Sequence, residues 1–86
     1  MDINKLIAII KNKLQNQTYI EKIDIEDKSF LHKNHSTNQK GKFHLKINLK
    51  SDELKNISRI EGNKKIYKAL DKEIKEYIHS IQILIT

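Results

Sequence analysis

The last quarter of the sequence, residues 63–86, changes from a helical to a strand-like hydrophobic pattern without a loop between them. This change constrains the fold more than any other feature. The first part predicts a helix with one core-facing stripe, because its apolar and aromatic residues recur at helical spacing: Ile66, Tyr67, Leu70, Ile74, Tyr77 and Ile78. After His79, the alternation of Ile81, Ile83 and Ile85 with polar neighbours predicts a strand buried on one side. Packed structure on both sides should fix the position of His79, which is therefore the first candidate for a site.

The N-terminal part of the chain repeats the order of helix followed by strand. Asp2 can cap a helix whose apolar stripe is Ile3, Leu6, Ile7, Ile10 and Leu14. Residues 19–26 then change to period two, with Ile23 and Ile25 on one side, which predicts a half-exposed strand.

The middle of the chain contains a polar stretch, a strand and a short helix. Residues 27–42 have no hydrophobic period and predict a long loop, a second candidate site because it carries His32 and His35. Alternation over residues 43–50 predicts a strand with His44 on its polar face, as a solvated residue or a neighbour of a ligand. A short helix then begins at the cap Ser51, and we expect its core anchors to be Leu54, Ile57 and Ile60 and its end to be marked by Gly62 and Asn63.

These elements predict one α+β domain over residues 1–86. The first two strands can pair antiparallel, and the third enters after a crossover helix and can pair parallel. We therefore expect two layers, a three-stranded mixed sheet with helices on one face.

Length and composition limit the functions to consider. The chain has 86 residues, 33% of them charged, and no cysteine, which excludes a disulfide, a thiol nucleophile and a thiolate metal site. Its apolar stretches are too short and too charged for a membrane span, so a soluble cytoplasmic protein is expected. A non-enzyme is also expected, because there is no Gly-rich phosphate loop and no recognisable Ser-His-acid motif.

Several separated motifs resemble the BolA family. The family's carboxylate, serine and histidine are similar to Asp27, Ser29 and His32, and its further loop histidine to His35. The remaining matches are the strand start at His44, Leu45, Lys46 and Ile47, the strand-end Ser51, the helix motif at Ile66, Tyr67 and Leu70, and the C-terminal signature at Ile78, His79, Ser80 and Ile81.

The resemblance implies a class II KH-like fold of order α-β-β-α-α-β and a partnership with a monothiol glutaredoxin. In that partnership a [2Fe-2S] cluster, shared with the glutaredoxin and glutathione, serves iron–sulfur assembly, trafficking or iron sensing. It is not expected in the isolated protein, for which we expect a monomer or weak homodimer. Carried over to this chain, the family's cluster ligands are His79 and His32, with His35 as the competitor of His32 for the role of loop ligand.

Nucleic-acid binding in transcriptional regulation of stress response and morphology is the alternative. KH-like folds bind single strands, and the net charge of +6 favours phosphate. The residues for this role are a helical row, Lys64, Lys68, Lys72 and Lys75. However, the Gly-x-x-Gly loop of KH domains is missing. The lysines also have acidic neighbours, so the row can be explained as the solvent-exposed face of a helix.

Overall fold

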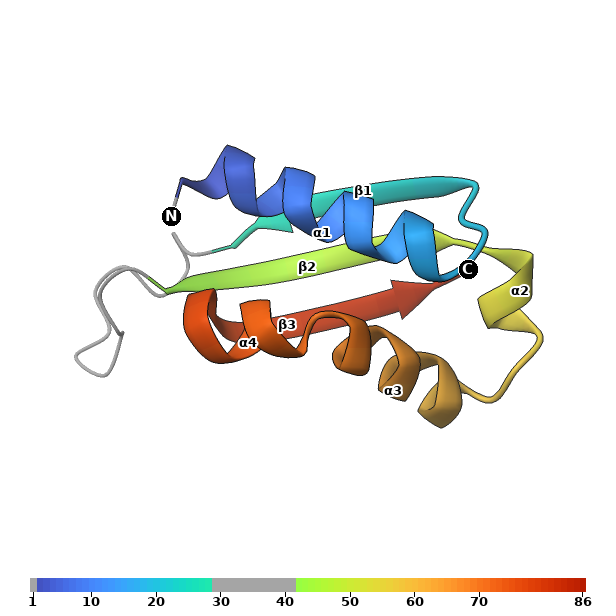
Figure 1. Cartoon of the computed structure of the whole chain (residues 1–86). Helices are drawn as coiled ribbons and strands as arrows, with labels where there is room; N and C mark the ends of the chain where they lie inside the picture. Colours follow the sequence, from blue (N-terminus) through green and yellow to red (C-terminus); the bar gives the residue numbers. More distant parts are fainter. Residues whose placement is uncertain (1, 29–41) are drawn as a thin grey trace.

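The computed structural model describes residues 2–28 and 42–86, and its elements follow the expected order closely (Figure 1). They are α1 (Ile3–Gln17), β1 (Lys22–Asp27), β2 (Phe43–Lys50), α2 (Asp52–Lys55), α3 (Arg59–Ala69), α4 (Asp71–Tyr77) and β3 (Ile78–Ile85). His32 and His35 lie outside the described residues. The predicted loop was placed one residue too early, since Asp27 is the last residue of β1.

The sheet has three strands in the order β1-β2-β3, with β1 antiparallel and β3 parallel to the central β2. The helices lie together on one face of it (Figure 1). This arrangement confirms the predicted two-layer α+β fold and its mixed sheet.

The core lies between the helices and that face of the sheet. Its buried members come from every element except β1 and α4: Leu6, Ile10, Leu14, Leu45, Ile47, Leu49, Leu54, Ile66, Leu70 and Ile78. The hydrophobic stripes read from the sequence therefore predicted most of the core. Tyr67 is an exception, because 42% of its surface is exposed.

Local signals set the ends of the N-terminal helix. The Asp2 carboxylate accepts a hydrogen bond from the Asn4 N–H, which confirms the predicted cap. At the other end the Thr18 N–H donates to the Leu14 carbonyl, and the chain then becomes extended. Ile23 and Ile25 of β1 pack against the core as predicted.

The predicted break at Gly62 and Asn63 is wrong, because both residues lie inside α3. Ser58 begins this helix by accepting a hydrogen bond from the Glu61 N–H. Gly62 meets a packing requirement instead, since a Cβ there would lie 3.2 Å from the Cδ1 atom of Ile85. The helix breaks later, at Leu70, although hydrogen bonding continues there through the Leu70 N–H to the Ile66 carbonyl.

Two predicted anchors of the short helix are also wrong. Leu54 is buried, but Ile57 is 36% and Ile60 69% exposed. The reason is that α2 ends at Lys55 and α3 begins at Arg59. Because the chain turns between the two helices, Ile57 and Ile60 do not lie on the helical face that Leu54 occupies.

Candidate functional site

His79 is the second residue of β3 and lies where the pairing of β2 with β3 changes register. Phe43 pairs with Ile78 and His44 with Ser80, so His79 is an extra residue, as in a β-bulge. The bulge allows both Ile78 and Ile81 to face the core although they are three positions apart, and strict alternation would separate them. As a result the His79 side chain is exposed instead of buried.

His44 lies directly beside His79. The centroids of the two imidazole rings are 4.8 Å apart, and their planes are tilted by 53°. The Nδ1 atom of His44 is 2.7 Å from the Oγ atom of Ser80, a hydrogen bond between the two strands. His44 is 5% exposed, so its interpretation as a solvated residue is wrong and its interpretation as a neighbour of the candidate ligand is supported.

This pair of histidines is built by the strands and not by the helices. His44 has the opposite parity to the core residues Leu45 and Ile47, so it belongs to the sheet face opposite the helices. The chain enters β3 directly from α4, and Ile78 is buried immediately before His79. A backbone anchored on both sides therefore presents the exposed imidazole in one place.

A pocket of about 350 Å³ opens beside His44. Its lining includes Lys28, His44, Lys46, Ser80 and Gln82. Most of these side chains can donate hydrogen bonds, and none of the described lining residues carries a carboxylate. Lys28 pairs with Glu26, with 3.6 Å between its Nζ atom and the Oε1 atom of Glu26, so both signs of charge lie at this pocket.

Tyr77 ends α4 two positions before His79. A hydrogen bond with the Glu76 side chain, reinforced by the negative charge of that group, raises the pKa of the Tyr77 hydroxyl above its ordinary value of 10.0.

Within residues 2–28 and 42–86, no group of three or more histidine and carboxylate side chains is arranged to hold a metal ion. His79 is an exposed imidazole, a ligand suited to iron and other borderline metals. The described part of the chain could thus supply a ligand to a shared centre, but not a complete coordination sphere. The predicted ligands His32 and His35 lie outside this part, and their role stays a prediction.

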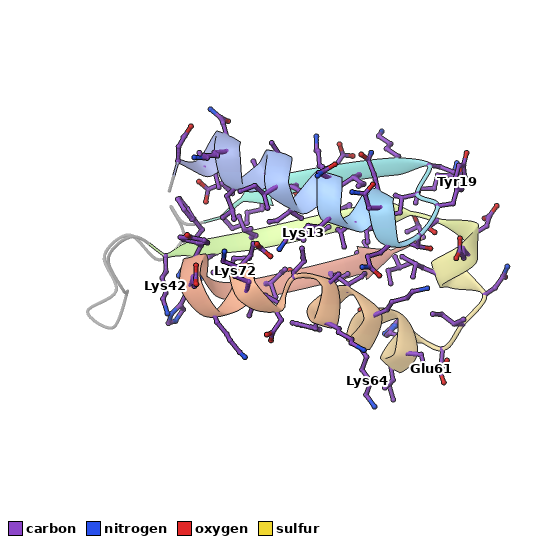
Figure 2. The ribbon with its side chains drawn as sticks, viewed as in Figure 1. Lys13, Tyr19, Lys42, Glu61, Lys64 and Lys72 are labelled. Carbon is purple, nitrogen blue, oxygen red and sulfur yellow. The ribbon has the colours of Figure 1, made fainter. Side chains whose placement is uncertain are left out.

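The lysine row does not lie on one continuous helix. Lys64 and Lys68 belong to α3 and Lys72 and Lys75 to α4, with the break at Leu70 between them. All four are exposed, and Lys64 and Lys72 lie well apart along the molecule (Figure 2). Lys75 pairs with Asp71, with 3.1 Å between its Nζ atom and the Oδ2 atom of Asp71. The row is therefore weaker as a phosphate-binding surface than its spacing suggests.

No helix among the described residues has the length and apolar character needed to cross a membrane.

Comparison with known proteins gives one consistent result. The model of the family described as BolA-like protein matches residues 14–86. A relative from Haemophilus influenzae, named as the DNA-binding transcriptional regulator BolA, is 32% identical over 75 residues, which are 87% of this chain and 70% of that protein.

Solved structures agree with this result. The BolA domain of SufE1 from Arabidopsis thaliana superposes with a TM-score of 0.74 at 25% identity, covering 90% of this chain and 85% of that one. BolA1 from the same plant superposes with a TM-score of 0.76 at 19% identity, covering 93% and 88%.

Proposed function

The chain belongs to the BolA-like protein family, and on this premise we propose that it is a non-catalytic protein that binds a monothiol glutaredoxin and co-ligates a [2Fe-2S] cluster. Its role would be in iron–sulfur assembly, trafficking or iron sensing. The observation that carries the proposal is His79, an exposed imidazole that a bulge presents at the start of β3.

The surroundings of His79 support a ligand role. The His44 ring lies beside the His79 ring, and a hydrogen bond between His44 and Ser80 holds the His44 ring. A ligand held in this way loses less conformational freedom on binding than a mobile surface histidine.

The incomplete donor set also fits a shared centre. Iron–sulfur clusters require four protein or cofactor ligands, and His79 would supply one of them. We propose that His32 supplies the second, with His35 as the competitor, and that the glutaredoxin and glutathione supply thiolates. Imidazole ligands would raise the reduction potential of the cluster relative to thiolates.

The test is reconstitution of a cluster with a monothiol glutaredoxin and glutathione, followed by visible circular dichroism. We expect a heterodimer spectrum distinct from that of the glutaredoxin homodimer, lost in His79→Ala and altered in either His32→Ala or His35→Ala. Lys22→Ala is the control, because this exposed residue pairs with Lys50 at the end of β2 away from His44 and should leave the spectrum unchanged. A spectrum of the homodimer alone with the wild-type chain would contradict the proposal.

Nucleic-acid binding is the second candidate, favoured by the name of the Haemophilus influenzae relative and by exposed lysines on α3. Its test is binding to single- and double-stranded DNA at several salt concentrations. A binding constant that falls steeply with salt, and falls further in Lys64→Ala/Lys68→Ala, would support this candidate. Absence of binding at low salt would remove it.

A further inference from the structure

A groove of about 360 Å³ lies at the end of β3 away from His79. One wall is formed by the four consecutive residues 82–85, and the other by the turn between α2 and α3, including Ile57 and Arg59. Consecutive strand residues point alternately to opposite faces of a sheet. A groove lined by four of them in a row must therefore run along the open edge of the strand.

The backbone of this edge is available for pairing. The Thr86 N–H donates to the Leu49 carbonyl, and the Thr86 carbonyl accepts from the Ser51 N–H, so Thr86 directs both groups toward β2. In a parallel pair, alternate residues direct their N–H and C=O groups toward the paired strand, and the residues between them direct theirs away from it. The N–H and C=O groups of Ile83 and Ile85 thus point to the outer edge, where no strand of residues 2–28 or 42–86 is paired with β3.

The groove combines an apolar lining with positive charge. Leu54, Ile57 and Leu84 contribute aliphatic surface, and Ile57 and Leu84 remain 36% and 47% exposed. Lys55 and Arg59 stand at the same turn, and the described lining contains no carboxylate. An occupant should therefore offer apolar groups together with negative charge.

The two edges of the sheet differ in charge. On β1, Lys22, Asp24 and Glu26 place a charged side chain at every second position of the edge strand, a common protection against pairing with another chain. On β3, residues 78–86 contain no lysine, arginine, aspartate or glutamate. The β3 edge thus lacks the protection that β1 carries.

We propose that this groove binds an extended segment of a partner protein, with alternating apolar and acidic residues, which adds to β3 as a fourth strand. The main chain of the segment would pair with Ile83 and Ile85 while its carboxylates meet Lys55 and Arg59. The proposal does not depend on His79 or on the cluster.

Two other occupants fit less well. Single-stranded nucleic acid is bound largely by stacking of bases on aromatic rings, and the described lining of the groove contains no aromatic residue. A second copy of β3 would pair along the edge, but residues 78–86 contain no aspartate or glutamate to meet Lys55 and Arg59. An acidic extended peptide can pair with the backbone of Ile83 and Ile85, and its carboxylates can meet Lys55 and Arg59.

The experiment titrates the labelled protein with an acetylated and amidated hexapeptide, Val-Glu repeated three times, followed by amide NMR. We expect saturable shifts at residues 82–85 and slower hydrogen exchange of the Ile83 and Ile85 amides. The same peptide N-methylated at every amide has no N–H group to donate to the edge of β3, and it should cause neither effect. A peptide with lysine in place of glutamate should bind at least about fivefold more weakly.

Variants localise the site. Arg59→Ala should weaken binding of the glutamate peptide about fivefold, and Leu84→Asp at least about tenfold. Both residues are exposed, so neither change should impair folding. Lys22→Ala removes a lysine from the opposite edge strand and should leave the affinity unchanged.

Three results would overturn the proposal. The first is absence of saturable shifts at residues 82–85, and the second is equal binding of the N-methylated peptide. The third is occupation of the groove by a deoxythymidine octamer, or by a second copy seen as a concentration-dependent dimer, in preference to the peptide.

Discussion

Ser51 shows how one buried hydroxyl joins three parts of the chain. It is fully buried, and its Oγ atom donates to the Tyr19 carbonyl at 2.7 Å and accepts from the Leu54 N–H at 3.2 Å. Its own N–H donates to the Thr86 carbonyl at 3.1 Å. The residue thus connects the segment after α1, the start of α2 and the end of β3.

Replacing Ser51 by alanine should lower the free energy of unfolding by about 2 kcal/mol, because the buried Leu54 N–H and the partly buried Tyr19 carbonyl lose a hydrogen-bond partner. Urea denaturation measures the change. Ser58→Ala is the control, since Ser58 caps α3 in an exposed position and its loss should cost about 1 kcal/mol. Equal losses of unfolding free energy in the two variants would show that the hydrogen bonds of the Ser51 hydroxyl add nothing beyond helix capping.

At the scale of elements, α1 is joined to α4 by an ion pair between Lys13 and Glu73. The Nζ atom of Lys13 lies 2.8 Å and 2.7 Å from the two carboxylate oxygens of Glu73, and Lys13 extends from α1 toward the lower helices (Figure 2). The Glu73 side chain is 4% exposed and that of Lys13 37%. The carboxylate is therefore the more costly group to leave without a partner.

Lys13→Met should destabilise the protein by about 2 kcal/mol, a value reduced by the access of water to the lysine end of the pair. Replacing both residues, as Lys13→Met/Glu73→Met, should restore most of the loss, because no charge is then buried alone. The double-mutant cycle is measured by chemical denaturation. A double variant as unstable as the sum of the single variants would mean that the pair has no coupling energy.

At the scale of the whole molecule, stability depends on the central strand. β2 is paired on both sides, and Leu45, Ile47 and Leu49 point into the core under the helices. Amides of β2 should therefore exchange with solvent more slowly than those of either edge strand.

Ile47→Ala should cost about 3–4 kcal/mol, since Ile47 is fully buried and the cavity cannot collapse between two paired strands. A chain of this length has a total stability of roughly 4–13 kcal/mol, so the loss is a large share of it. Ile47→Val should cost about 1 kcal/mol, and the urea midpoint measures both. Equal midpoints for the two variants would contradict a tightly packed centre.

The sequence by itself determined the order of the elements, the mixed sheet and most of the core. Periods of 3.6 and 2 report which side chains share a face, and the caps Asp2 and Ser51 mark helix starts that the structure confirms. His79 could also be singled out, because the change of period places it at a junction. These properties are local, so the residues that decide them are neighbours in the sequence.

Contacts between distant segments depended on the tertiary structure. The burial of His44 beside His79, the close approach of Ile85 to Gly62, and the exposure of Ile57 and Ile60 each follow from how strands and helices pack. The bulge that exposes His79 arises from the pairing of β3 with β2, which no local period specifies. The physical reason is that alternation assigns a face to each side chain, whereas register and packing decide what covers that face.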